Sequence, residues 1–112
     1  MSIDLLRRAA APGPDGVVVR TDPADAGWRY LTFDVHRLAP GARVDRPGDD
    51  EEVLVLVLEG TATVTAGNAP DGIGGTAVGG TWEGIGGRDT VFSMAPAGMV
   101  LAAPGADVTV VA

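Results

Sequence analysis

Apolar and polar side chains alternate with a period of two along several segments of this chain. Between residues 28 and 38, Phe33 and Val35 fall on one face of an extended backbone, and Asp34 and His36 fall on the other. Successive side chains of a β-strand point to opposite faces, so this pattern predicts a strand. Other strands are predicted at residues 17–20, 61–65, 90–94, 99–101 and 108–111.

Residues 53–58 form the longest strongly apolar run, with six consecutive Val and Leu side chains. A run without alternation is typical of a strand that is buried on both faces, and we expect a central strand here. Glu59 and Gly60 follow as a turn, so residues 61–65 are predicted to form a hairpin with this strand.

Glycine and proline mark the predicted turns. Pro40–Gly41 and Pro104–Gly105 separate strands, while the glycine-rich residues 67–87 disfavour a long regular element. Residues 2–11 are expected to form a short helical turn. Eight or so short strands separated by such turns predict an all-β fold, an antiparallel barrel or sandwich.

Composition agrees with this fold class and excludes several kinds of partner. The chain has 112 residues, 17 of them glycine and 8 proline, which fits one domain rich in strands and turns. The net charge is −7 and there is no basic cluster beyond Arg7–Arg8, so no nucleic-acid partner is expected.

The chain has no cysteine, and its apolar runs are shorter than the roughly 20 residues that cross a membrane. We therefore expect no thiolate site, no membrane partner and a cytoplasmic location. Because the last residues lie within a predicted strand, the chain is expected to be part of a longer protein.

Few side chains are candidates for chemistry. The single histidine, His36, is expected to be a surface or hydrogen-bonded core residue rather than a catalytic one, since no second imidazole exists for a metal pair or a catalytic triad. Asp49, Asp50 and Glu51 are interpreted as a charged turn, with a weak oxygen-ligand site as the alternative.

Two residues are retained as cavity candidates, Arg88 and Glu52; the catalytic residues themselves stay unknown. Arg88 follows a glycine-rich stretch, residues 84–87, that lacks the lysine and helix of a phosphate loop. We expect Arg88 to brace neighbouring carbonyl or carboxylate groups, and it is also the best candidate for binding an acidic sugar. Glu52 is kept as a possible inward-facing carboxylate.

The spacing of Gly41, Glu52 and Gly60 is similar to the signature of the cupin barrels. In that signature two histidines precede the glutamate and bind a metal together with it. Here the corresponding positions lie near Pro47 and Asp49. The chain therefore resembles a cupin-like antiparallel β-barrel, a jelly roll or double-stranded β-helix, with no metal site of its own.

A more specific resemblance follows from blocks of sequence in a fixed order. They are residues 26–33, 38–41, 52–60, 86–92 and 104–105, which read AGWRYLTF, LAPG, EVLVLVLEG, GGRDTVF and PG. These blocks resemble the first barrel of the 5-deoxy-glucuronate isomerases, two-barrel cupin enzymes of inositol catabolism. The resemblance implies an N-terminal segment with a short strand at residues 1–25, and a cupin-like barrel at residues 26–112 that forms the N-terminal half of such an enzyme.

The resemblance also implies a function. The family isomerises 5-deoxy-glucuronate, a small acidic aldose, to the ketose 2-deoxy-5-keto-gluconate. Its divalent metal is expected in the second barrel, which this chain does not contain, so no cofactor is expected here. The expected partners are the small acidic sugar and either the missing C-terminal half or a second copy, bound through apolar residues.

Two other functions remain open. The chain is alternatively a non-catalytic cupin module with a structural or ligand-binding role. A sugar epimerase ranks last, because its chemistry needs an acid and a base on opposite ring faces, and the chain lacks such histidine or tyrosine pairs.

Overall fold

The computed structural model describes residues 9–21, 31–70 and 77–112 as an all-β protein. The strands are β1 (Val17–Thr21), β2 (Phe33–His36), β3 (Arg43–Arg46), β4 (Val53–Val57), β5 (Gly60–Pro70), β6 (Ala77–Arg88), β7 (Gly98–Ala102) and β8 (Asp107–Val111). Every pairing among them is antiparallel. None of the described segments forms a helix long and apolar enough to cross a membrane.

The chain divides into two compact units, residues 1–39 and 40–112. In the first unit β1 pairs with β2, and Arg20 lies opposite Asp34 in the register. A main-chain hydrogen bond from Arg37 N to the carbonyl of Gly16 (2.7 Å) extends this ladder. The strand predicted at residues 28–38 corresponds to β2, which covers only Phe33–His36 in the described residues. The helical turn predicted at residues 2–11 lies mostly outside them, and the predicted boundary at residue 25/26 stays a prediction.

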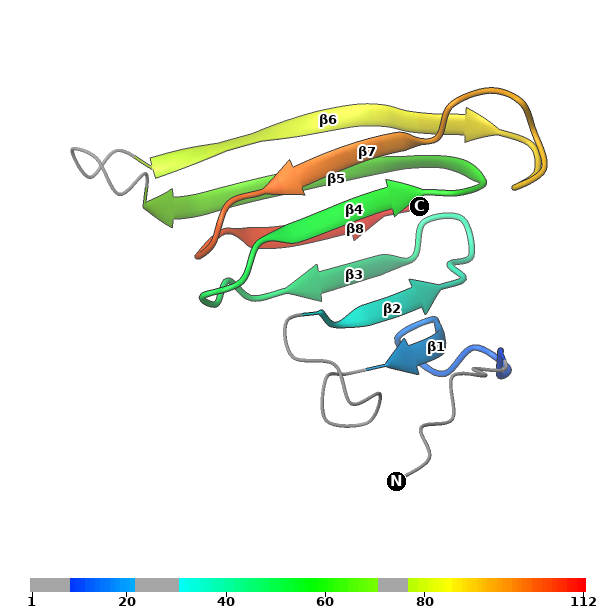
Figure 1. The fold of residues 1–112 in the computed structure, drawn as a ribbon, viewed down its shortest axis with the longest axis horizontal. Helices are drawn as coiled ribbons and strands as arrows, with labels where there is room; N and C mark the ends of the chain where they lie inside the picture. The colour runs from blue at the N-terminus through cyan, green and yellow to red at the C-terminus, as the bar shows by residue number, and fades with distance from the viewer. Residues whose placement is uncertain (1–8, 22–30, 71–76) are drawn as a thin grey trace. The chain divides into compact units, whose positions relative to one another are not determined.

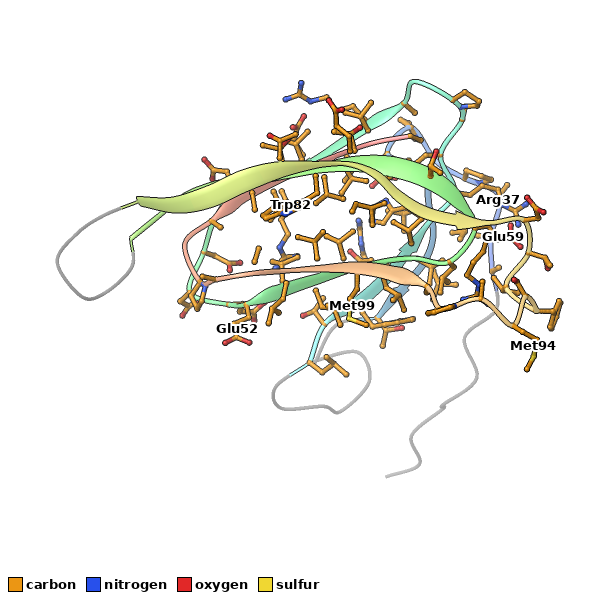
Figure 2. The ribbon with its side chains drawn as sticks, turned by 90° about the horizontal axis from the view of Figure 1, so that it is seen from above. Arg37, Glu52, Glu59, Trp82, Met94 and Met99 are labelled. Atoms are coloured by element: carbon orange, nitrogen blue, oxygen red, sulfur yellow. The ribbon has the colours of Figure 1, made fainter. Side chains whose placement is uncertain are left out.

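The second unit consists of two sheets. Four strands lie in the order β3-β8-β5-β6, and β4 pairs with β7 in a separate two-stranded sheet. Figure 1 shows β4 and β7 running along β5, β6 and β8, and Figure 2 shows the two sheets as separate layers with side chains between them. β8 lies between strands from distant parts of the sequence, since it pairs with both β3 and β5.

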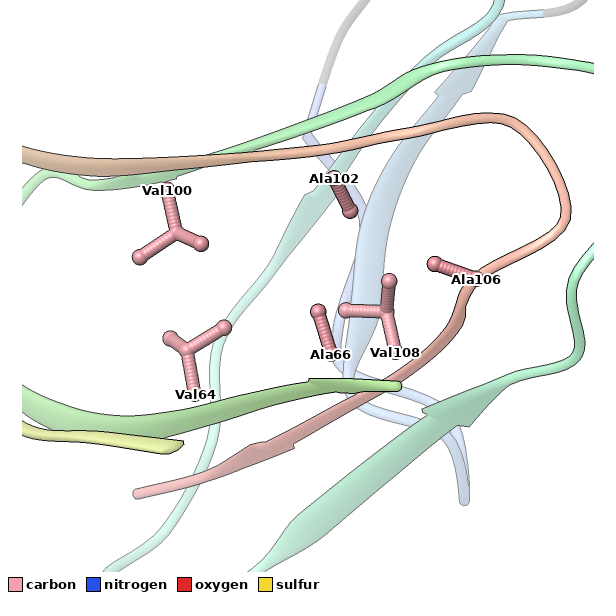
Figure 3. Close-up of a cluster of buried hydrophobic side chains, with 6 residues drawn as sticks. All are labelled: Val64, Ala66, Val100, Ala102, Ala106 and Val108. Carbon is pink, nitrogen blue, oxygen red and sulfur yellow. The ribbon is translucent and has the colours of Figure 1, made fainter. Parts of the chain in front are cut away.

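Small apolar side chains fill the space between these layers. The buried cluster consists of Val64, Ala66, Val100, Ala102, Ala106 and Val108 (Figure 3). Val53, Val55, Ile85 and Val110 pack against it with partial exposure. The period of two along β5, β7 and β8 places these side chains on the inner faces, so the alternation in the sequence is what builds this core.

Glycines let the two layers approach each other at one end. A β-carbon on Gly98 of β7 would lie 2.6 Å from the backbone nitrogen of Gly86 in β6. One on Gly86 would meet the carbonyl oxygen of Gly60 and the side chain of Val57 in β4. Gly86 also has a positive φ of 107°, which L side chains rarely adopt.

The sequence predictions for β6 and for the partner of β4 were wrong. Glycines were expected to prevent a long element in residues 67–87, but β6 is a twelve-residue strand. The hairpin predicted between residues 53–58 and 61–65 does not form, because β5 pairs with β6 and β8 while β4 pairs with β7.

Two further predictions are corrected by the packing. Residues 90–94 were predicted as a strand and instead form turns and bends after β6. β4 was predicted to be buried on both sides, yet Leu54 and Leu56 are exposed while Val53 and Val55 pack against the core. The apolar run is therefore an alternating strand. Its valines lie on the face toward the core, and its leucines lie on the outer face.

Candidate functional site

The space between the two sheets offers no ligands for a metal ion. Its buried lining is valine and alanine with Ile85 packed against it, and the described residues contain no group of three His, Cys, Asp or Glu side chains that could hold a metal. Alkyl side chains neither donate electron pairs to a cation nor compensate its lost hydration. The described part of the chain therefore does not fit a resident divalent metal of the cupin type.

The acidic turn before β4 is organised around Arg46. The Nη2 atom of Arg46 lies 3.5 Å from Asp49 Oδ2 and 3.3 Å from Glu51 Oε2. Asp49 Oδ1 also accepts a hydrogen bond of 2.9 Å from the main-chain N–H of Glu51. Two carboxylates of this turn are therefore engaged with an arginine and the backbone, as expected for the charged turn.

Arg88 ends β6 and holds the loop that follows. Its Nη2 atom donates hydrogen bonds to the carbonyl oxygens of Val91 and Ser93, the latter at 3.3 Å. Glu59 holds the same loop from the turn between β4 and β5, since its Oε1 accepts a hydrogen bond of 3.1 Å from Val91 N. Register places the two residues at one end of the fold, because Arg88 pairs with Gly60.

Hydrogen bonds between residues two or three positions apart also stabilise this loop. Ser93 N donates to the carbonyl of Thr90 (3.0 Å), and Ala95 N donates to the hydroxyl of Ser93 (3.2 Å). The loop exposes Phe92 and Met94 almost completely, and Figure 2 shows Met94 at its tip. Two charged side chains thus hold a loop that presents two large apolar side chains.

Glu52 lies at the other end of β4 and is exposed. Its position in the alternation is that of the exposed Leu54 and Leu56, on the outer face of the sheet. The length of β4 separates Glu52 from Arg88, on the order of 17 Å for five residues of strand. The structure therefore does not bring the two candidates of the sequence analysis together, as the labels in Figure 2 also indicate for Glu52 and Glu59.

His36 belongs to the first unit. Its Nδ1 atom lies 3.1 Å from the carbonyl oxygen of Asp15, a hydrogen bond in which a protonated Nδ1 is the donor. Asp34, on the same strand, forms an ion pair of 3.5 Å with Arg20 Nε. These contacts link β1, β2 and the turn before β1.

A second charged cluster lies on the outer face of the four-stranded sheet. Asp45 Oδ1 accepts hydrogen bonds from Arg43 Nε (2.9 Å) and from the hydroxyl of Thr109 (2.8 Å). The hydrogen bond from Arg43, supported by that from Thr109, lowers the pKa of Asp45 below its usual value. This cluster joins β3 to β8 at the surface.

Glu59 was not predicted to hold the loop. It was assigned only to a turn, because nothing local in the sequence connects it with Val91. The one indication in the sequence was Arg88, which follows the glycine-rich segment. It was expected to brace nearby carbonyl or carboxylate groups, but the particular groups could not be named. The pairing of β5 with β6 is what brings residues 59 and 88–91 together.

Comparison with known proteins gives consistent results. The model of the KduI/IolB family matches residues 5–112. Two curated relatives, the 5-deoxy-glucuronate isomerases of Geobacillus thermodenitrificans (strain NG80-2) and Geobacillus kaustophilus (strain HTA426), are each 32% identical over 86 residues, which are 77% of this chain. The aligned region is 27% of each relative, so the chain spans about a quarter of their length.

A solved structure supports the fold. The crystal structure of an IolB-like protein from Salmonella typhimurium LT2 superposes with a TM-score of 0.75 and 26% identity, over 94% of this chain and 35% of that one. With the antiparallel sheets described above, this confirms the all-β, cupin-like fold class. The family match covers nearly the whole sequence, and the chain belongs to the KduI/IolB family.

Proposed function

We propose that this chain is the N-terminal cupin part of a 5-deoxy-glucuronate isomerase, which converts 5-deoxy-glucuronate to 2-deoxy-5-keto-gluconate in inositol catabolism. The observation that carries the proposal is the family match over residues 5–112, together with the 32% identity to curated enzymes of that name. The proposed substrate is accordingly a small acidic sugar.

In this proposal the described residues supply scaffold rather than reacting groups. The metal that polarises the oxygens in such an aldose–ketose exchange is assigned to a second barrel outside these residues. This assignment is supported by the valine and alanine lining between the sheets, which offers no ligands. Arg88 and Glu59 are proposed to position residues 89–97 rather than to bind sugar, because Arg88 Nη2 is engaged with two main-chain carbonyls.

A chimera tests the proposal. The quarter of the Geobacillus kaustophilus relative that aligns with this chain is replaced by the 86 residues of this chain that align with it, and conversion of 5-deoxy-glucuronate is followed by NMR. We expect the chimera to convert the sugar and the chain alone, supplied with divalent metal ions, to be inactive. A folded chimera that does not convert the sugar, beside an active parent enzyme, would contradict the proposal.

The second candidate is a non-catalytic cupin module. It is favoured by the same apolar lining, since a module without chemistry needs no ligands in its interior. Titration calorimetry of the chain alone with glucuronate distinguishes the two. If the chain alone binds glucuronate and the folded chimera is inactive, the non-catalytic module is supported.

A further inference from the structure

The turn before β1 contains an Asp–Gly pair, Asp15–Gly16, and aspartate rearranges most readily when glycine follows it. In this reaction the main-chain nitrogen of the glycine bonds to Cγ of the aspartate, and one carboxyl oxygen leaves as water, which closes a five-membered succinimide ring. Water then breaks the bond between that nitrogen and the original main-chain carbonyl carbon. The product is isoaspartate, in which the main chain runs through the former side chain and is one carbon longer.

The fold requires glycine at position 16. Gly16 has a positive φ of 75°, which L side chains rarely adopt. A β-carbon there would lie 2.6 Å from Leu38 Cδ2 and 2.9 Å from the carbonyl oxygen of Arg37. A branched residue, which would crowd the attacking nitrogen and slow the reaction, therefore does not fit. Protection of this pair has to come from hydrogen bonds.

The atoms that would react are already engaged. Gly16 N, the attacking atom, donates a hydrogen bond of 2.9 Å to the carbonyl of Gly13. Asp15 Oδ1 accepts from Val17 N (3.1 Å), and Asp15 Oδ2 accepts from Arg20 Nη2 (3.3 Å). The hydrogen bond from Val17, supported by Arg20, lowers the pKa of Asp15, which leaves less of the neutral acid that loses water. Ring closure turns Cγ toward Gly16 N, so these hydrogen bonds have to open first.

Arg20 and His36 fasten this turn to the pair of strands that follows it. His36 Nδ1 donates to the carbonyl oxygen of Asp15 (3.1 Å). Arg20 binds Asp15 through Nη2 and Asp34 of β2 through Nε, the latter at 3.5 Å. β1 and β2 form the one strand pairing of the first unit among its described residues. Because an isolated two-stranded pair is marginal in water, it should open locally at a low free-energy cost.

We propose that Asp15–Gly16 is a site of isoaspartate formation, that opening of β1 from β2 sets the rate of this reaction, and that Arg20 and His36 restrain it. The longer main chain of the product displaces the carbonyl that His36 binds, so rearrangement makes the opening permanent. The second unit should keep its fold, since its core is built from its own residues. The proposal does not depend on the isomerase assignment.

Peptide mapping of the full chain tests the proposal. The chain is incubated at physiological temperature and pH and digested with trypsin, and isoaspartate is identified by electron-transfer fragmentation. A synthetic peptide of residues 9–20, which trypsin also releases between Arg8 and Arg20, is the unfolded reference. We expect isoaspartate at residue 15 in the full chain, formed at least about tenfold more slowly than in the peptide. The second Asp–Gly pair, Asp71–Gly72, lies outside the described residues and in a different tryptic peptide.

Two variants test the restraint. Arg20→Gln and His36→Ala should each accelerate isoaspartate formation in the full chain about fivefold, as expected for the loss of one hydrogen bond. Hydrogen exchange at Arg37, whose N–H donates to Gly16 O (2.7 Å), should accelerate by the same factor, because it reports the same opening. Arg46→Gln is the matched control. Arg46 also pairs with two carboxylates, but in the second unit, so this variant should change neither rate.

Three results would overturn the proposal. The first is a full chain that forms no isoaspartate at residue 15 while the peptide reacts, and the second is a full chain that reacts as fast as the peptide. The third is a pair of variants that react no faster than the unchanged chain, or that react faster without faster exchange at Arg37. In that last case strand opening does not set the rate.

Discussion

At the scale of single residues, the charged side chains of this protein mainly hold loops and strands in place. Arg46 holds the turn before β4, Arg43 and Asp45 join β3 to β8, and Arg88 with Glu59 holds the loop after β6. A hydrogen bond to a charged group stabilises an exposed loop only modestly, by about 1–3 kcal/mol at most. Removing such a group should therefore loosen its loop without unfolding the protein.

The Glu59→Ala variant tests this for the loop after β6. Val91 N donates to Glu59 Oε1, so the variant leaves this amide without its acceptor. Hydrogen exchange at Val91 should accelerate, while the free energy of unfolding falls by about 1 kcal/mol or less. Glu51→Ala is the control, because Glu51 pairs with Arg46 in a different turn and should leave Val91 unchanged. Unchanged protection of Val91 in Glu59→Ala would show that Arg88 holds the loop alone.

At the scale of elements, the sequence predicts where most strands lie but not how they pair. The alternation at residues 17–20, 61–65 and 108–111 identifies β1, β5 and β8, because a half-buried strand carries its own pattern. Pairing depends on contacts between distant residues. β5 pairs with residues of β8 that lie 40 to 48 positions later rather than with its neighbour β4, and nothing local encodes that choice.

The candidate site was predicted only in part for the same reason. The bracing role of Arg88 is visible in the sequence as an arginine after glycines, but its targets appear only once β6 is seen as a strand. Residues 90–94 have the composition of a strand. They form a loop because the N–H and the carbonyl of Val91 are hydrogen-bonded to Glu59 and Arg88. In a strand these main-chain groups would pair with a neighbouring strand.

Glycine within β6 and β7 is expected to be required by packing rather than by flexibility. In Gly98→Ala the new β-carbon would lie 2.6 Å from Gly86 N and 2.7 Å from Ile85 Cγ2, so β6 or β7 must shift. We expect a loss of about 1–3 kcal/mol in the free energy of unfolding, measured with urea. Gly67→Ala is the control, because a β-carbon there meets nothing within 4 Å, and stability should change little or rise slightly. Equal effects of the two variants would contradict a steric role for Gly98.

At the scale of the whole molecule, the described residues that build the core of the second unit all lie within residues 40–112. Each member of the buried cluster, and each residue packed against it, comes from this unit. All four strand pairings of the two sheets also lie within it. The first unit, in contrast, has one two-stranded pairing in its described residues, and isolated pairs of strands are marginal in water.

Residues 40–112 should therefore fold when they are expressed alone, whereas residues 1–39 should not. A small domain with a core of valine and alanine is expected to have a free energy of unfolding of only about 3–5 kcal/mol, so the fragment should unfold cooperatively at low urea concentration. The measurement is a comparison of amide NMR spectra. The fragment should show dispersed resonances that superpose on those of β3 to β8 in the full chain, apart from shifts near Pro40. A collapsed spectrum for residues 40–112, recovered only when residues 1–39 are restored, would mean that the two units fold as one.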